Sequence, residues 1–209
     1  STMGKYYDAF FPGLEKFLNR KVFYIVHVQE NFFKSVYSLK KISKKNVMPY
    51  EYFIRLRDIF NAYFKILFIK NFNFDEATLY GVNISEPLEL EYRMTCISLN
   101  NLLFYDSIRE FIKKTKVKKA YFTFENISWE NMFTLSFKDH SKETELIGYQ
   151  HTVVPQAAMG MFLGKYEGQL RPLPSKVITT GIESLKIINN YSQSKHYNLK
   201  AGPALRYQY

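Results

Sequence analysis

The sequence predicts an α/β protein with a Rossmann-like, doubly wound parallel sheet and additional helices in the first half. Short runs of β-branched and aromatic residues alternate with helical stretches, most clearly after residue 119, and this alternation is typical of parallel sheets. The chain has 209 residues, enough to bury one substantial core. Since no repeat or strong boundary divides the chain, we expect residues 1–209 to form a single domain.

Four elements are expected in the first part of the chain. A short helix over Asp8–Arg20 leads into a strand over Val22–Val28, which is rich in β-branched and aromatic residues. The segment Asn31–Lys45 is expected to form a helix with a basic outer face. Apolar residues then recur at three- and four-residue steps over Tyr50–Lys70, which predicts a long amphipathic helix with its aromatic stripe in the core.

The middle of the chain is expected to be helical. Ser85 is a candidate cap for one helix, and Leu88–Lys114 has helical character for much of its length. The basic cluster Lys113–Lys119 then lies near a helix C-terminus, where the helix dipole favours positive charge.

The second half gives the clearest pattern of strands and helices. Strands are expected over Lys119–Glu125, Leu146–Tyr149 and Lys176–Thr180, and a further strand begins near Leu199–Ala201; helices are expected over Trp129–Lys142 and Ile182–Tyr191. Right-handed crossovers would place the carboxyl ends of these strands along one edge of the sheet, where such folds bind ligands.

The formal net charge is +10, which favours an anionic partner. Most of the excess lies in the first half, in Lys34–Lys45 and Lys113–Lys119, and the first of these clusters predicts contact with an anionic membrane surface. Lysine outnumbers arginine by 22 to 7, which disfavours nucleic acid because base-edge and bidentate phosphate recognition favour arginine. An AT-rich genome is an alternative source of the lysines.

The composition also restricts location and redox chemistry. Cys96 is the one cysteine, so no intrachain disulfide is possible, and its apolar surroundings predict a buried, unreactive thiol. No stretch is long and apolar enough for a transmembrane helix, and the opening residues lack the apolar region of a signal peptide. We expect a cytoplasmic protein with peripheral contact to the inner face of the membrane.

Three residues follow the ends of successive predicted strands. Glu125, His151 and Gly181 would therefore converge on one crevice at the sheet edge. His151 is the candidate general base, because imidazole titrates near neutral pH and can deprotonate a sugar hydroxyl. A satisfied structural histidine is the alternative for this residue. His27, which follows another strand, is expected to line the same edge.

Two acidic residues flank the single tryptophan, Trp129. Glu125 is a candidate catalytic carboxylate that could also orient His151. Glu130 is a candidate substrate-binding residue, with a first-turn acid favoured by the helix dipole as the alternative. Substrate binding is also assigned to Trp129 and Gly181, and to Gln150 and Thr152 on either side of His151. The chain has no DxD, HExxH or cysteine cluster and no phosphate loop, so we predict no metal and no cofactor.

Four motifs occur in order over Ala120–Tyr209: ENISWEN, ELIGYQHTVVP, LPSKVITTG and AGPALRYQY. Together they resemble bacterial GT-B-type glycosyltransferases of surface polysaccharide biosynthesis. The matching positions are Glu125, Trp129, Glu130, Gly148, Gln150, His151, Pro172, Pro174, Lys176, Gly181, Gly202, Leu205 and Arg206. Residues 1–119 carry no such resemblance.

The resemblance implies a function and an architecture. GT-B enzymes have two Rossmann-like domains, so the chain would be the N-terminal, acceptor-side half of such an enzyme. It would help to transfer a sugar from a nucleotide-sugar donor, bound mainly by a missing C-terminal domain, to a glycan or lipid-linked acceptor. We therefore expect the chain alone to be inactive.

Three alternatives stay open. The first is a non-catalytic module that docks on a membrane or on a polysaccharide-assembly complex through the basic first half. The second is a GT-B-like nucleotide-sugar epimerase, since a fold does not determine its chemistry. The third is single-stranded nucleic-acid binding, which no RNP-like motif supports.

Overall fold

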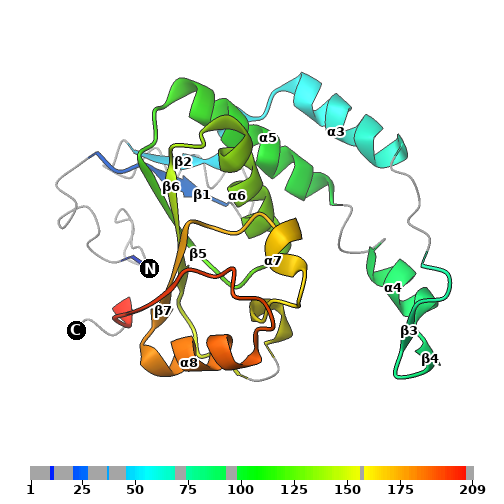
Figure 1. Cartoon of the computed structure of the whole chain (residues 1–209). Coiled ribbons are helices and arrows are strands. Elements are labelled where there is room, and N and C mark those ends of the chain that lie inside the picture. The colour runs from blue at the N-terminus through cyan, green and yellow to red at the C-terminus, as the bar shows by residue number, and fades with distance from the viewer. Residues whose placement is uncertain are drawn as a thin grey trace.

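The computed structural model confirms the α/β fold class and contains a Rossmann-like parallel sheet (Figure 1). It describes residues 10–11, 21–27, 37, 46–68, 74–92, 98–155 and 158–205. Cys96 lies outside these residues. So do the helices expected over Asp8–Arg20 and Asn31–Lys45 and the lysine cluster Lys34–Lys45, apart from Phe10, Phe11 and Tyr37.

Four parallel strands form the main sheet, in the order β5-β6-β7-β8. They are β5 (Lys119–Thr123), β6 (Glu145–Gln150), β7 (Lys176–Thr180) and β8 (Leu199–Gly202). The strand order follows the chain order, so each strand pairs with the next one along the chain. All four strands point the same way, and their carboxyl ends share one edge.

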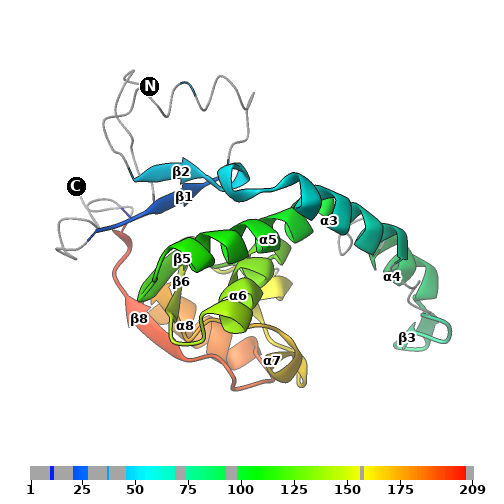
Figure 2. The same ribbon diagram turned by 90° about the horizontal axis from the view of Figure 1, so that it is seen from above.

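The main helices share one hydrophobic core with the sheet. These helices are α5 (Leu99–Lys114), α6 (Ser128–His140) and α8 (Ile182–Tyr191), with the short α7 (Glu167–Leu170) and a 3-10 turn, η3 (Met159–Met161), between β6 and β7. Ile108, Phe137 and Ile188 are almost fully buried and belong to one cluster with Phe122 and Val177 of the sheet. Figure 2 shows α5 lying alongside α6.

A close approach at β6 shapes this core. Gly148 lies opposite Phe122 in the register and faces the ring of Phe124, which is 1% exposed. A Cβ atom at Gly148 would lie 2.8 Å from the Cβ of Phe124. The absence of a side chain in mid-strand is therefore what admits the Phe124 ring to the core.

The first half adds two small sheets instead of extending the main one. The strand expected over Val22–Val28 is β1 (Tyr24–Val26), and it pairs in parallel with β2 (Val47–Pro49). A short hairpin contains β3 (Thr78–Leu79) and β4 (Val82–Asn83).

Two long helices predicted in the first half are divided. The segment Tyr50–Lys70 contains a 3-10 turn, η1 (Tyr50–Phe53), and then α3 (Leu56–Phe68). The segment Leu88–Lys114 contains the end of α4 (Ser85–Glu91) and the separate α5. Ser85 is the first residue of α4, and its hydroxyl donates to the carbonyl oxygen of Phe74.

The prediction that the apolar stripe of α3 lies in the core is wrong. Leu56, Phe60 and Phe64 are exposed, whereas Asp58 and Ala62 are buried. The helix therefore packs on α5 through its polar and small face, and its apolar face points outward. Ion pairs between α3 and α5 explain this orientation.

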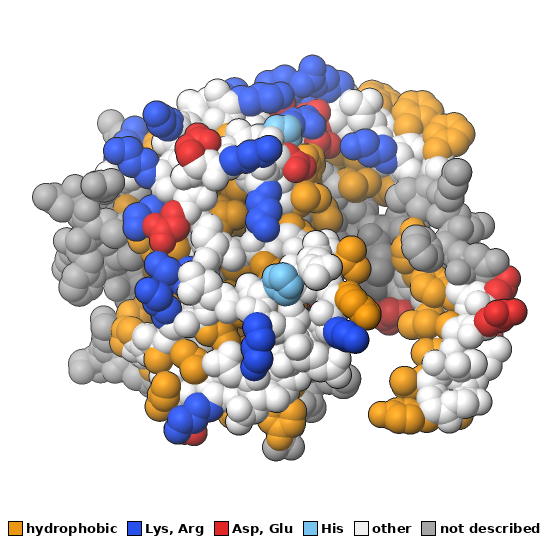
Figure 3. All heavy atoms as spheres, viewed as in Figure 1, with side chains coloured by type: hydrophobic (Ala, Val, Ile, Leu, Met, Phe, Trp, Pro, Cys, Tyr) orange, Lys and Arg blue, Asp and Glu red, His pale blue; other side chains and the backbone are white. Residues whose placement is uncertain are grey.

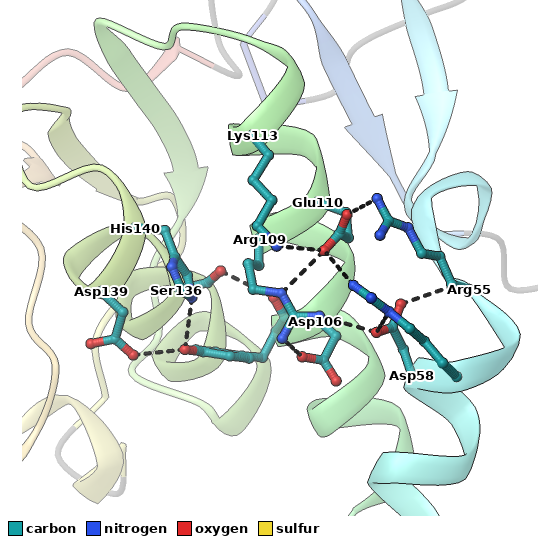
Figure 4. Close-up of polar contacts among 11 residues, drawn as sticks. Arg55, Asp58, Asp106, Arg109, Glu110, Lys113, Ser136, Asp139 and His140 are labelled. Carbon is teal, nitrogen blue, oxygen red and sulfur yellow. Dashed lines mark hydrogen bonds and ion pairs between the residues drawn. The ribbon is translucent and has the colours of Figure 1, made fainter.

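Buried carboxylates join α3 to α5 (Figure 4). Arg109 of α5 lies between Asp58 of α3, 3.0 Å away, and Asp106 of α5. Glu110, also almost fully buried, accepts from Lys113 at 2.9 Å and pairs with Arg55 at the start of α3. Three carboxylates thus meet four cations, because Arg57 also approaches Asp58 and Glu110 at 3.6 Å.

Two acids of this cluster have pKa values shifted in opposite directions. Burial raises the pKa of Asp106, and Arg109 offsets this only in part. Burial also tends to raise the pKa of Glu110, but the hydrogen bond and charge of Lys113, together with Arg55 and Arg109, hold it below its ordinary value. Glu110 therefore stays ionised at neutral pH.

None of the helices in the described ranges has the length and apolar character needed to cross a bilayer.

The packing at β6 predicts the effect of Gly148→Ala. The new methyl group would overlap Phe124, which belongs to a filled core, and overpacking of this kind costs about 1–3 kcal/mol. Urea denaturation should show this loss in the free energy of unfolding. Gly160→Ala is the matched control, since the nearest atom to its Cβ would lie 3.7 Å away. Equal stability of the two variants would contradict the steric argument.

The ion-pair cluster predicts that Arg109→Met destabilises the protein by about 3 kcal/mol. Asp58 and Asp106 would stay buried but would lose the guanidinium group that pairs with both of them. Lys186→Met is the control: it breaks the exposed Lys186–Glu183 pair and should change stability by less than about 0.5 kcal/mol. Thermal and urea unfolding measure both. A similar small effect at Arg109 would show that apolar contacts alone hold α3.

Candidate functional site

The carboxyl edge of the sheet brings together the residues that follow β5, β6 and β7. Glu125 comes two residues after the end of β5, His151 directly follows β6, and Gly181 directly follows β7. The expected convergence of these positions arises from parallel pairing alone, because adjacent parallel strands end side by side.

The carboxylate of Glu125 lies next to the side chains of both His151 and Thr152. The Nε2 atom of His151 is 3.8 Å from Oε1 of Glu125, and the hydroxyl of Thr152 donates to the same oxygen at 3.3 Å. The side chain of His151 is 12% exposed and that of Glu125 is 41% exposed. The ring of Phe10 meets the His151 imidazole edge-on at 4.7 Å. The imidazole is therefore held among these groups, while the carboxylate remains open to a ligand.

Gln150 has a structural role at this edge. Its Oε1 accepts from the backbone N–H of Thr180 at 3.2 Å and from the Thr180 hydroxyl at 3.1 Å. Its Nε2 donates to the carbonyl oxygen of Thr152. The side chain is 1% exposed and joins the ends of β6 and β7. It positions Thr152 and is too buried to take part in substrate binding directly.

Glu130 is also buried, at the start of α6. It is the third residue of the helix, and its carboxylate accepts from the backbone N–H of Glu125 at 2.8 Å and of Ile127 at 3.1 Å. Acceptance of the N–H of Ile127, the N-cap residue, is the reciprocal half of a capping box. Burial raises the pKa of Glu130 to about 7, against the lowering effect of these N–H groups. Glu130 therefore fixes the turn that presents Glu125.

Two predicted substrate-binding residues lie elsewhere. Trp129 is half-buried and packs edge-on against Phe104 of α5, with ring centroids 5.9 Å apart. His27 stacks on Tyr50 at 5.3 Å and lies 3.7 Å from Glu51. His27 directly follows β1, and among the described residues the β1–β2 sheet is not hydrogen-bonded to β5–β8.

Gly181 begins the turn from β7 into α8. Its φ of 88° lies in the left-handed region, which favours glycine, and no heavy atom lies within 4 Å of where its Cβ would be. Its N–H donates to the carbonyl oxygens of Thr179 and Gly202, both at 2.9 Å. Gly181 therefore leaves an open backbone surface beside Thr180.

Two residues of this edge carry no functional signal in the sequence. The hydroxyl of Thr180 shares its one proton between Oε1 of Gln150 and the carbonyl oxygen of Thr152, which lies 3.2 Å away, and so completes the network around Gln150. Asn126 has a φ of 60°, is 4% exposed and donates to the carbonyl oxygen of Gly160 at 2.7 Å. The only signal for Asn126 in the sequence is its type, since asparagine tolerates the left-handed region after a strand.

The arrangement is suited to proton transfer. A neutral His151 can accept a proton, and Glu125 at 3.8 Å would stabilise the resulting imidazolium. In the part of the chain that the structure describes, no three His, Cys, Asp or Glu residues are grouped so that they could hold a metal ion. Glu125 and His151 thus form a carboxylate–imidazole pair at the sheet edge.

The raised pKa of Glu130 predicts a pH dependence of stability. The folded protein binds this proton more tightly than the unfolded chain, whose glutamate has a pKa of 4.5. The contribution is complete below pH 4.5 and is lost as the pH rises through about 7. Relative to Glu130→Gln, the free energy of unfolding of the wild type should fall by up to about 3 kcal/mol over this range in urea titrations. A difference that stays constant or rises would show that the N–H donors keep Glu130 ionised.

Comparison of the whole chain with family models, curated proteins and solved structures finds no match in any of the three.

Proposed function

We propose that this chain is the acceptor-side domain of a glycosyltransferase that transfers a sugar from a nucleotide-sugar donor to a glycan or lipid-linked acceptor of a cell-surface polysaccharide. The observation that carries the proposal is the His151–Glu125 pair at the carboxyl edge of a parallel sheet, with 3.8 Å between Nε2 and Oε1. Ligands bind at this edge in open α/β folds.

The roles of the two residues are assigned from their chemistry, since imidazole is the side chain that serves as a general base near neutral pH and Glu125 is the carboxylate beside it. His151 would remove the proton from the attacking acceptor hydroxyl, and Glu125 would orient the ring and stabilise its positive charge. Thr152 holds Glu125 in place through its hydroxyl. The bond between the sugar and the nucleotide breaks as the acceptor oxygen bonds to the sugar, and the nucleotide leaves with the bonding electrons. A second domain would bind that nucleotide.

The resemblance to GT-B enzymes supports the choice of sugar transfer over other acid–base chemistry. The residues that carry it include Glu125, His151 and Gly181, and the structure places all three at the ends of consecutive parallel strands. A nucleotide-sugar epimerase would use the same edge. The two activities differ in products, because an epimerase changes the sugar without an acceptor.

The proposal predicts that acceptor oligosaccharides bind the 209-residue chain at His151. NMR titration with surface-polysaccharide oligosaccharides should shift the imidazole resonances of His151, and Glu125→Gln should weaken the effect. The imidazole of His140, exposed beside Tyr105 and Asp139, is the internal control and should not respond.

In a protein that joins this chain to a donor-binding domain, His151→Ala should lower the transfer rate by about 10²–10⁴-fold and His140→Ala should not. A wild-type rate for His151→Ala would exclude it as the base. Clear turnover of a nucleotide sugar by the 209-residue chain alone would contradict the division into two domains.

A further inference from the structure

The outer face of α3 is the largest feature that the proposed function leaves unexplained. Six large apolar side chains on this helix are each between 54 and 78% exposed: Leu56, Phe60, Tyr63, Phe64, Leu67 and Phe68. Burial of apolar area is the main driving force of folding and association, so a continuous exposed stripe of this kind marks an interaction surface.

The stripe is not needed for the fold. Helix α3 contacts α5 through Asp58 and Ala62, which are both 1% exposed, and through the ion pairs of Arg55 and Arg57. The hydrophobic core formed by α5, α6, α8 and the sheet includes no residue of α3. The outer face is therefore available to another partner without loss of the packing beneath it.

The charges around this face are selectively positive. Arg55, Arg57 and Lys65 are exposed, whereas the one acid of α3, Asp58, is buried. Arg55 and Arg57 also pair with the buried carboxylates, but the three carboxylates of the cluster face four cations, so one positive charge is left in excess and Lys65 adds to it. Lys113 and Lys114 lie nearby at the end of α5, which pairs with the start of α3. Figure 3 shows Lys and Arg side chains along the upper edge of the molecule, beside the apolar patch of α3.

We propose that the outer face of α3 docks on the surface of an anionic lipid bilayer. A helix with aromatic and aliphatic residues on one face and Arg and Lys at its margins has the character of helices that lie in the plane of a membrane interface. The cations would meet lipid phosphates, and the apolar side chains would enter the boundary of the hydrocarbon layer. This inference does not depend on sugar transfer.

Charge favours a lipid surface over a second copy of the chain. A two-fold dimer through α3 would bring Arg55, Arg57 and Lys65 of one copy towards the same cations of the other. An anionic bilayer instead neutralises the positive charge that the ion pairs leave in excess on this face. It also accommodates an irregular apolar face, because lipid chains adapt to its shape.

The test is co-sedimentation of the 209-residue chain with vesicles of phosphatidylcholine and phosphatidylglycerol, and with vesicles of phosphatidylcholine alone. The wild type should bind the anionic vesicles, and added salt should weaken the binding. The double variant Phe60→Ser/Phe64→Ser should lower the partition coefficient roughly tenfold or more, since it removes two aromatic side chains from the buried face.

A matched double variant controls for loss of exposed apolar area in general. Tyr166→Ser/Leu170→Ser changes two side chains, 61 and 81% exposed, on and beside α7. It should bind vesicles as the wild type does, and circular dichroism should show both variants folded. Equal binding by all three proteins, equal binding to the two kinds of vesicle, or no binding to anionic vesicles would overturn the proposal. So would a dimer in analytical ultracentrifugation that only Phe60→Ser/Phe64→Ser dissociates.

Discussion

Parallel pairing of β5, β6, β7 and β8 is the constraint on which the candidate site depends. Each strand enters the sheet in the same direction, so the residues after β5, β6 and β7 meet at one edge whatever the loops between them. Gln150 then fixes the positions of two strand ends at this edge, because its amide joins the end of β6 to Thr180 of β7. Glu130 fixes the turn after β5, because its carboxylate accepts from the backbone N–H groups of Glu125 and Ile127. The pair Glu125 and His151 is the part of this edge left for chemistry.

Away from this edge, buried ion pairs determine how α3 packs on α5. Asp58, Asp106 and Glu110 lose most of their hydration, and the cations around them recover that loss only when α3 and α5 are in register. A misplaced α3 would leave carboxylates buried without partners. The ion pairs thus specify one orientation of a helix whose hydrophobic pattern alone would have favoured the opposite one.

The sequence was most informative where a strand or helix is determined locally. The β-branched run of β7 and the amphipathic α8 have the bounds that periodicity predicts. The approximate positions of Glu125 and His151 followed from strand ends. The orientation of α3 did not follow, because the pair Arg109–Asp58 joins residues 51 apart in the chain and leaves no periodic signal. The burial of Gln150 and Glu130 likewise depends on neighbouring strands and turns, which residue type does not reveal.

The two candidate surfaces rest on separate interactions. The sheet edge is held by backbone pairing and by the amide of Gln150, whereas the outward face of α3 is held by ion pairs to α5. Changes to Phe60 or Phe64 therefore leave Glu125 and His151 in place, because these exposed rings belong to no part of the shared core. The proposed membrane contact and the proposed acid–base chemistry thus rest on different parts of the fold, and each can be tested without disturbing the other.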